Sequence, residues 1–545
     1  MAAMLAASMV FLALPAMLHA GNSDEFVWPL VSILFTYWRF ALSLGLACVL
    51  PTLLLPRRLA LLWAAGCSSF ALYLWAYGTF VVYDFGLLDG RNWRIEPHPA
   101  AIAVEALLVV AVLIAAFVVG RRSPSAVAGS LSVLALANAL SAAGAIHADR
   151  RRPPPSRELS SLFRFSEEKN VLVVLLDSMQ SDIFHEVVRE NPDLEGALEG
   201  FTFYPDTAGV APSTYLAMPA IHSGLVYDRA SSMRGYFEEG VGRESFLNAL
   251  SRKGYESGLV NPIVGLCPES VRVCATDTEV LGGGAQASLV RDAASLLDAV
   301  LLRVAPLGLK RSVYNEGRWR LAPLVEDPRL AHHVVRGNNL LRELAANLSV
   351  ARRGPTVKFL HLFGTHLPMV LDQGCVFRAE TVRWSRANYK IQVGCSLEAL
   401  RMLLSALKRE GVYDSTAIAL LADHGTGMES ARVASEASAP INPTLVGLAN
   451  PTLAFKPRHA KGPFRRSNEL VSIADVSAII CEDVGDCVGR RRAQGAGRAY
   501  ASFVWSQSYI EKDHVPGIVG YKIRGSLFDT RNWHRIDDPE VGDHD

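Results

Sequence analysis

The sequence predicts an α/β fold in two parts: a bundle of about five transmembrane helices, then a soluble domain whose largely parallel central sheet is flanked by helices. Three observations predict it. The chain has 545 residues and a mean hydropathy of +0.20, too long and too apolar for one soluble domain. Ionisable residues are scarce before residue 148 and frequent after it. Beyond about residue 160, short β-rich runs alternate with helical ones, as in α/β sheets.

The apolar block divides into stretches that each approach the ~20 residues needed to cross a bilayer. The two Arg-Arg pairs at 57–58 and 121–122 fall on one side under alternating topology, and the acidic pair at 24–25 falls on the other. The positive-inside rule therefore predicts an inside N-terminus and an outside C-terminal domain. A cleaved signal peptide at 1–20 would leave that domain outside as well. The predicted spans are about 3–20, 30–55, 59–83, 100–120 and 126–147.

Two ionisable residues interrupt the predicted spans. Arg39 lies inside the second span and Glu105 near the outer end of the fourth. Charges inside membrane helices usually face the bundle interior or a watery cavity, which makes both residues functional candidates. Snorkelling to the interface is the simpler interpretation, and for Arg39 a span that begins near Phe40 would also explain it.

The soluble part runs to residue 545 and carries six of the eight cysteines in local couples. An even set of cysteines at short spacing, in a domain predicted to be outside, favours disulfides over a zinc site, although spacing alone does not prove the connectivity. The predicted pairs are Cys267 with Cys274, Cys375 with Cys395, and Cys481 with Cys487. The predicted domains are 1–148 for the membrane bundle, 149–160 for a proline-rich linker, and 161–545 for the soluble domain. Within the last, Gly282 to Arg311 is predicted to be a loop and helix near the membrane.

Two predicted buried strands end in residues that suit a metal. Val171–Leu176 is followed by Asp177, and Ala417–Leu421 leads to Asp423-His424-Gly425. Ligands of open α/β sheets gather at the carboxyl ends of strands. A carboxylate beside an imidazole suits zinc or manganese. Each motif alone also fits a turn or a helix cap.

Two further motifs carry candidate phosphate chemistry. The predicted strand Val357–Leu362 leads to His366, which lies just past the strand end, whereas His361 within the strand fits a core histidine. The run Ala211–Pro219 places Thr214 at the predicted start of a helix, where free backbone N–H groups favour anions. A hydroxyl there suits a metal-activated nucleophile, and an ordinary helix cap is the alternative.

In their order along the chain, which is Asp177, Thr214, His366 and Asp423-His424-Gly425, the four motifs resemble those of the membrane-anchored transferases of the alkaline phosphatase superfamily. These include phosphoethanolamine transferases, lipoteichoic acid synthases and phosphoglycerol transferases. The resemblance covers the whole chain, with detailed matches in four patches. It implies a sulfatase-like domain outside the membrane on about five spans.

The resemblance assigns roles to individual residues. Asp177, Asp423 and His424 match the ligands of one divalent metal, with zinc expected first and manganese or magnesium as alternatives. Thr214 matches the nucleophile, which also contacts the metal. His366 matches the histidine that contacts the phosphoryl group. The implied reaction moves a phospho-head group from a membrane phospholipid to an envelope glycan or lipid through a phospho-threonine.

The chain also departs from the family pattern. Asp-His-Gly is followed by Thr426 rather than Glu, the first strand ends in Asp177 rather than Glu, and no histidine lies between His424 and His459. These departures leave the donor open, as well as two alternatives: a non-catalytic sensor or scaffold, and a sulfatase or phosphodiester hydrolase. The Cys/Ser-x-Pro-x-Arg frame of sulfatases is missing around Thr214. The expected setting is a monomer in a bacterial inner membrane with its soluble domain in the periplasm, and a net charge of +1 gives no sign of a nucleic-acid partner.

Overall fold

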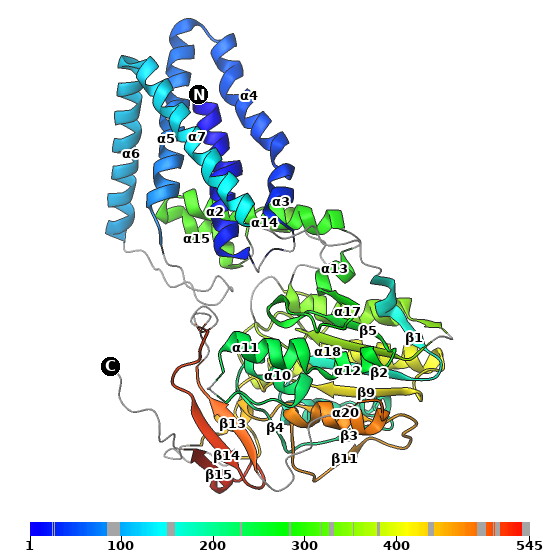
Figure 1. Cartoon of the computed structure of the whole chain (residues 1–545). Coiled ribbons are helices and arrows are strands. Elements are labelled where there is room, and N and C mark those ends of the chain that lie inside the picture. Colours follow the sequence, from blue (N-terminus) through cyan, green and yellow to red (C-terminus); the bar gives the residue numbers. More distant parts are fainter. Residues whose placement is uncertain are drawn as a thin grey trace. The chain divides into compact units, whose positions relative to one another are not determined.

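The protein is described by a computed structural model, shown in Figure 1. Its contacts form two compact units: Met1–Ser156 with Gly282–Pro328, and Arg157–Leu281 with Arg329–Asp545. We call them the membrane unit and the α/β unit. Residues 150–158 of the predicted linker lie outside the described residues, and the predicted domain boundaries stay a prediction. The residues described are 1–23, 26, 28–83, 99–149, 159–228, 231–282, 285–317, 319–325, 332–351, 354–378, 382–433, 441–487, 497–504, 506, 509 and 513–536.

Long apolar helices make up most of the membrane unit. Four are long and apolar enough to cross a membrane: Ala2–Gly21, Arg57–Phe80, Pro99–Val119 and Ser125–Ala148. Leu30–Thr36 and Trp38–Leu54 form a pair bent by 43°, which gives up to five spans if the pair counts as one. The prediction of about five apolar spans therefore agrees with the described residues, and the bend falls beside Arg39. The helices are α1 (Ala2–Ser8), a π-helical turn (Met9–Ala13), α2 (Leu14–Gly21), α3 (Leu30–Thr36), α4 (Trp38–Leu54), α5 (Arg57–Phe80), α6 (Pro99–Arg122) and α7 (Pro124–Ala148).

The segment Gly282–Pro328 packs with these helices although it interrupts the sequence of the α/β unit. It holds α14 (Ala285–Val304), α15 (Leu307–Tyr314) and α16 (Ala322–Val325). In Figure 1, α14 and α15 lie across the ends of the long helices. The Tyr37 hydroxyl donates to the Ala293 carbonyl at 2.6 Å.

An eight-stranded sheet forms the centre of the α/β unit, in the order β11-β3-β10-β9-β2-β8-β5-β6. β2 pairs in parallel with β8 and β9, β5 with β8 and β6, and β3 with β11, whereas β10 is antiparallel to β9 and β3. The three predicted buried strands, Val171–Leu176, Val357–Leu362 and Ala417–Leu421, are confirmed as β2, β8 and β9. The strands are β2 (Asn170–Leu176), β3 (Thr202–Phe203), β5 (Glu256–Val260), β6 (Val273–Ala275), β8 (Thr356–Leu362), β9 (Thr416–Leu421), β10 (Leu453–Lys456) and β11 (Arg465–Arg466).

Helices cover both faces of this sheet (Figure 1), so strand β2 is buried on both sides. Its alternate residues enter two different cores, Leu172 and Val174 on one face and Val171 and Val173 on the other. Two-sided burial explains why β2 is an unbroken apolar run rather than an alternating one. The first core takes α8 (Ser181–Glu190), α9 (Pro192–Ala197), α17 (His333–Asn347) and α18 (Arg386–Arg409); the second takes α10 (Thr214–Ser223), α11 (Met233–Phe237), α12 (Phe246–Arg252) and α20 (Val476–Val484).

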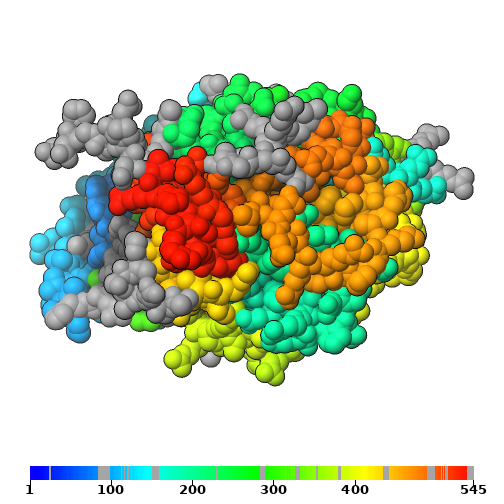
Figure 2. All heavy atoms as spheres, turned by 90° about the horizontal axis from the view of Figure 1, so that it is seen from below, coloured from blue at the N-terminus to red at the C-terminus, as the bar shows by residue number. Residues whose placement is uncertain are grey.

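A small antiparallel sheet ends the described chain and forms the red patch in Figure 2. Its Tyr500 and Trp533 share a separate apolar cluster with Val446 of α19 (Pro443–Leu448). Arg498 joins it to the rest of the unit through Asp206, at 3.0 Å. The remaining elements are β1 (Arg164–Ser166) with β7 (Ser349–Ala351), β4 (Thr207–Ala208) with β12 (Val471–Ser472), α13 (Asp277–Leu281), α19 (Pro443–Leu448), and β13 (Arg498–Ser502), β14 (Val519–Ile523) and β15 (Trp533–Ile536).

All three predicted disulfides are present. Their Cα–Cα distances of 6.2, 5.5 and 5.0 Å are ordinary for such bonds. Cys48 and Cys67, in the membrane unit, are free thiols. The prediction of local cysteine couples is therefore confirmed.

Candidate functional site

Asp177 stands at the carboxyl end of β2, between its two parallel neighbours. Its backbone N–H still donates to Leu362 of β8 at 2.9 Å, and its carbonyl accepts from the Thr365 hydroxyl at 2.6 Å. The chain then turns away at Ser178, whose φ is +64°. The Asp177 side chain is 1 % exposed. These contacts fix a buried carboxylate at the centre of the sheet edge.

Asp423, His424 and Gly425 follow the neighbouring strand β9. One Asp423 oxygen accepts the Ser178 N–H at 3.0 Å, while Oδ2 is buried without a hydrogen-bond partner. The His424 Nδ1 lies 2.8 Å from the Gly425 carbonyl, which can only accept, so Nδ1 carries the hydrogen and Nε2 keeps its lone pair. At Gly425 an added Cβ would meet the Gly447 oxygen at 1.8 Å. Glycine is required there because the Gly447 backbone comes too close for any side chain.

The three predicted metal-ligating side chains outside the helix lie together. Asp177, Asp423 and His424 each offer an atom within 4.8 Å of the others. The His424 Nε2 is 3.4 Å from Asp423 Oδ2 and 4.0 Å from Asp177 Oδ1. Two buried carboxylates repel each other in a medium of low dielectric, and a cation between them would relieve that repulsion. Asp423 Oδ2 has no hydrogen-bond partner, and His424 Nε2 directs its lone pair toward the two carboxylates. These atoms therefore suit a divalent metal.

Thr214 is the first residue of α10, and Ser213 is its N-cap. The Thr214 hydroxyl donates to Asp177 Oδ2 at 3.2 Å and lies 3.5 Å from His424 Nε2. The helix N-terminus adds free N–H groups and partial positive charge beside the hydroxyl, which favours an incoming anion. The structure thus brings the predicted nucleophile against two of the predicted ligands.

His366 lies at the rim of this group, with its side chain 35 % exposed. Its Nε2 is 3.9 Å from Asp177 Oδ1, and its Nδ1 lies 2.6 Å from the Leu367 carbonyl. Nδ1 therefore carries a hydrogen, and Nε2 faces the site. This position is compatible with the predicted contact to a phosphoryl group, which stays a prediction.

His361 belongs to the site, although the sequence predicted only a core histidine there. It is buried as predicted, yet its Nε2 lies 3.1 Å from Asp177 Oδ2 and its Nδ1 3.2 Å from the Asn261 carbonyl. Both partners are acceptors. Burial opposes the charged form, but the Asp177 carboxylate outweighs it and raises the pKa of His361. His361 thus holds the orientation of Asp177.

His333, at the start of α17, was missed altogether. Its Nε2 lies 2.9 Å from the Leu367 carbonyl, and its ring centroid is 5.3 Å from that of His366. Burial, together with the neighbouring His332 and His366, holds the pKa of His333 well below its usual value. A neutral His333 therefore supports the loop that carries His366.

The site keeps the Asp177 carboxylate ionised. Burial alone would raise its pKa, but His366, the hydrogen bond from His361 and the nearby His424 lower it well below the usual range. The pKa of His424 is raised: burial opposes its charge, but the Asp423 and Asp177 carboxylates overcome that effect. The group thus attracts positive charge.

A parallel sheet that collects two carboxylates, an imidazole and a helix-N-terminal hydroxyl at its strand ends defines an α/β protein with a candidate metal site at one edge of its sheet. Within that class, the sulfatase family model matches residues 169–482, more than half of the chain, and the chain belongs to this family. The matched range begins just before β2 and ends in α20, so it includes all the residues of the site. No curated protein matches the chain in sequence.

Several solved structures resemble the chain at low identity. The lipoteichoic acid synthase LtaP from Listeria monocytogenes is 11 % identical, with a TM-score of 0.33, over 60 % of this chain and 74 % of that one. The C-terminal periplasmic domain of EptC from Escherichia coli is 10 % identical, with a TM-score of 0.34, over 70 % of this chain and 95 % of that one. The phosphonate monoester hydrolase of Silicibacter pomeroyi is 11 % identical, with a TM-score of 0.39, over 66 % of this chain and 85 % of that one.

Proposed function

We propose that the chain is a metal-dependent transferase that moves a phospho-head group from a membrane phospholipid to an envelope glycan or lipid. Phosphoethanolamine and phosphoglycerol are the head groups considered. One observation carries the proposal: the Thr214 hydroxyl, at a helix N-terminus, lies 3.2 Å from Asp177 and 3.5 Å from His424. A hydroxyl placed against an ionised carboxylate and a metal-binding imidazole is arranged as a nucleophile.

In the first step the Thr214 oxygen bonds to phosphorus, and the bond between phosphorus and the diacylglycerol oxygen breaks. Thr214 loses its proton and diacylglycerol leaves with one. In the second step an acceptor hydroxyl loses its proton and its oxygen bonds to the same phosphorus, while the bond between phosphorus and the Thr214 oxygen breaks and Thr214 regains a proton. His366 faces the reacting centre and contacts a phosphoryl oxygen. The N–H groups at the start of α10 bind the same negative charge.

Asp177, Asp423, His424 and the Thr214 hydroxyl would hold one divalent metal. Such a metal lowers the pKa of the hydroxyl and neutralises phosphoryl oxygens. Mixed nitrogen and oxygen ligands suit zinc first, with manganese or magnesium as alternatives. His361 keeps Asp177 turned toward this position from behind.

The apolar helices support a lipid donor, because they keep the α/β unit beside a substrate that cannot leave the bilayer. Three disulfides suit an oxidising compartment outside the cytoplasm. We therefore place the α/β unit of a monomeric protein on the periplasmic side of a bacterial inner membrane.

The test is release of diacylglycerol from head-group-labelled phospholipid by the full chain in liposomes. Wild type should release it and carry the label on the Thr214 peptide. Thr214→Ala should abolish both, and Thr214→Ser should keep part of the activity because it keeps the hydroxyl. Ser213→Ala is the matched control, since Ser213 makes no side-chain capping bond and is not one of the predicted site residues.

Three outcomes would contradict the proposal. Diacylglycerol release by Thr214→Ala at the wild-type rate would reject Thr214 as the nucleophile. Label appearing only as free head group, with an acceptor present, would indicate a phosphodiester hydrolase. No release from any donor, together with no bound metal, would favour a non-catalytic sensor or scaffold.

A further inference from the structure

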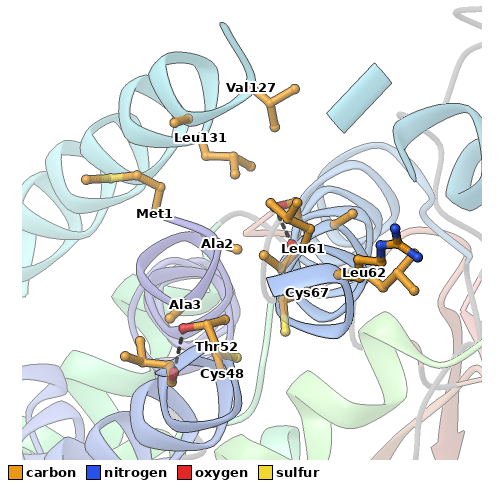
Figure 3. Close-up of a pocket in the computed structure, with 16 residues that line it drawn as sticks. Met1, Ala2, Ala3, Cys48, Thr52, Leu61, Leu62, Cys67, Val127 and Leu131 are labelled. Atoms are coloured by element: carbon orange, nitrogen blue, oxygen red, sulfur yellow. Dashed lines mark hydrogen bonds between the residues drawn. The ribbon is translucent and has the colours of Figure 1, made fainter. Parts of the chain in front are cut away.

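A cavity of about 700 Å³ opens within the membrane unit, among the starts of α1, α5 and α7 and the end of α4. Figure 3 shows labelled side chains from these helices gathered around one hollow, among them Cys48, Leu61, Cys67 and Leu131. Its size lies within the roughly 300–1,000 Å³ of sites that bind small molecules. The helix ends that form it are those beside the Arg-Arg pairs at 57–58 and 121–122.

The lining is basic and polar at one part and apolar elsewhere. Arg58 lines the cavity and no carboxylate does. Among the described residues, Arg58 has no hydrogen-bonding or ion-pair partner. The hydroxyls of Thr52 and Ser68 donate to carbonyls of their own helices, at 2.6 and 2.8 Å, so their oxygens can only accept from a ligand. The Arg58 guanidinium is therefore the charged side chain of the described lining, and it selects an anion.

The apolar walls decide between a free anion and a lipid. Leu61 and Leu62 are 59 % and 42 % exposed, on a helix long and apolar enough to cross a membrane. Side chains of this kind are solvated by acyl chains in a bilayer. A free phosphate would meet Arg58 but leave this surface uncovered, whereas a phospholipid covers both.

We infer that this cavity binds an anionic phospholipid of the inner leaflet, with its phosphate on Arg58 and an acyl chain along Leu61 and Leu62. The positive-inside rule places this end of the bundle at the cytoplasmic leaflet, where anionic lipids gather and basic pockets between helices bind their head groups. The site is separate from the strand-end group of the α/β unit. It does not depend on the transferase proposal.

The experiment measures lipid retention by the full chain in a mild non-ionic detergent, using native mass spectrometry. Phosphatidylglycerol, phosphatidylcholine and inorganic phosphate are added in parallel. Wild type should retain phosphatidylglycerol and bind it at least about fivefold more tightly than phosphatidylcholine, the factor expected for one basic residue at an anionic head group. Inorganic phosphate should neither bind measurably nor displace it.

Two pairs of variants separate charge from shape. Arg58→Gln should lose the preference for phosphatidylglycerol, whereas Arg57→Gln, one residue away and outside the cavity lining, should keep it. Ala128→Leu should fill the cavity and reduce binding of both lipids, whereas Ala126→Leu on the same helix should not. Thermal unfolding of each variant checks that the bundle is intact.

Cys48 and Cys67 give an independent readout because both line the cavity and are the free thiols of a chain whose other six cysteines are paired. Phosphatidylglycerol should slow their alkylation by N-ethylmaleimide in wild type and not in Arg58→Gln. Equal retention of the two lipids by wild type, or undiminished preference in folded Arg58→Gln, would overturn the inference. Displacement by inorganic phosphate would show a simple anion site instead.

Discussion

Glu105 of the membrane unit and Asp423 of the α/β unit are both shielded carboxylates, but their hydrogen bonding differs. Glu105 accepts hydrogen bonds from the Tyr77 hydroxyl and, at 3.0 Å, from the Leu307 N–H. Asp423 has one oxygen with a donor and one buried oxygen with none. A carboxylate whose hydrogen-bond donors all come from its own chain needs no ligand to account for its burial. A carboxylate with one buried oxygen that no donor reaches, beside a second carboxylate, fits a site for a cation.

Other charged groups of the membrane unit follow the pattern of Glu105. Asp298 is buried and accepts from the N–H groups of Leu321 and Ala322 at 2.9 and 2.8 Å. The Lys310 ammonium donates to the Leu302 carbonyl at 2.6 Å. Burial lowers the pKa of Lys310 to about 8, although Glu105 favours its charged form. These residues hold Gly282–Pro328 together and onto α6, so we assign Glu105 a structural role.

The largest expected effect comes from removing the Asp423 carboxylate, whose Oδ2 has no hydrogen-bond partner. Asp423→Ala should abolish metal binding and reduce transfer by roughly 10³-fold or more, because a metal contributes several kcal/mol to such reactions. The metal-free variant should be at least as stable as metal-free wild type, since one of two repelling buried charges is gone. Metal analysis, diacylglycerol release and thermal unfolding in chelator measure these three quantities. Lower stability of the metal-free variant would reject the repulsion.

A smaller effect is expected behind the site, at His361. His361→Gln should weaken metal affinity by about 10- to 100-fold, because it loosens the orientation of a ligand without removing one. Competition with a chelator of known affinity measures the change. His333→Gln is the control, since His333 contacts the Leu367 carbonyl rather than a predicted ligand. Equal loss in both variants would mean that His361 acts only through packing.

Substitution of Glu105 should lower the stability of the protein without removing the metal. Glu105→Gln should cost about 1 to 3 kcal/mol of unfolding free energy, the usual range for weakening a buried hydrogen-bonded group. Tyr77→Phe should cost less, because it removes a single donor to the carboxylate. Thermal or denaturant unfolding in detergent gives both values, and metal analysis gives the content. A loss of bound metal in Glu105→Gln would break the distinction between the two carboxylates.

The smallest expected effect concerns pH. Burial lowers the pKa of His222 to about 3, with its neighbour His361 adding to the shift. The folded chain therefore keeps His222 neutral, while the unfolded chain takes up a proton below about 6.5. Stability should thus fall as the pH drops from 7 to 5, by up to about 2 kcal/mol from this residue. His222→Asn should flatten the dependence, and an unchanged slope would contradict the assignment.

The sequence predicted the parts whose signals are local. β2 and β9 are continuous apolar runs because both faces of the sheet are covered, and parallel pairing brings their ends, Asp177 and Asp423, to one edge. The membrane helices are predictable from the length and hydropathy of their segments alone. Short cysteine spacings indicated the disulfides.

Contacts that join distant segments were not predictable. The segment Gly282–Arg311 was predicted to lie near the membrane, but its individual contacts with the N-terminal helices, such as Tyr37 with Ala293, are not revealed by any local pattern. His361 occupies an ordinary buried strand position, and only the parallel register with β2 shows that it faces Asp177. His333 reaches the site through a helix start more than thirty residues before His366, with no motif around it.

The central claim is that the strand-end group of the α/β unit is a metal site while Glu105 of the membrane unit is structural. The most direct measurement is the divalent-metal content of the full chain, purified without chelators, for wild type, Glu105→Gln and Asp423→Ala. We predict one metal per chain in the first two and none in the third. Equal metal content in all three proteins, or a metal-free wild type that still releases diacylglycerol in the presence of chelator, would contradict the claim.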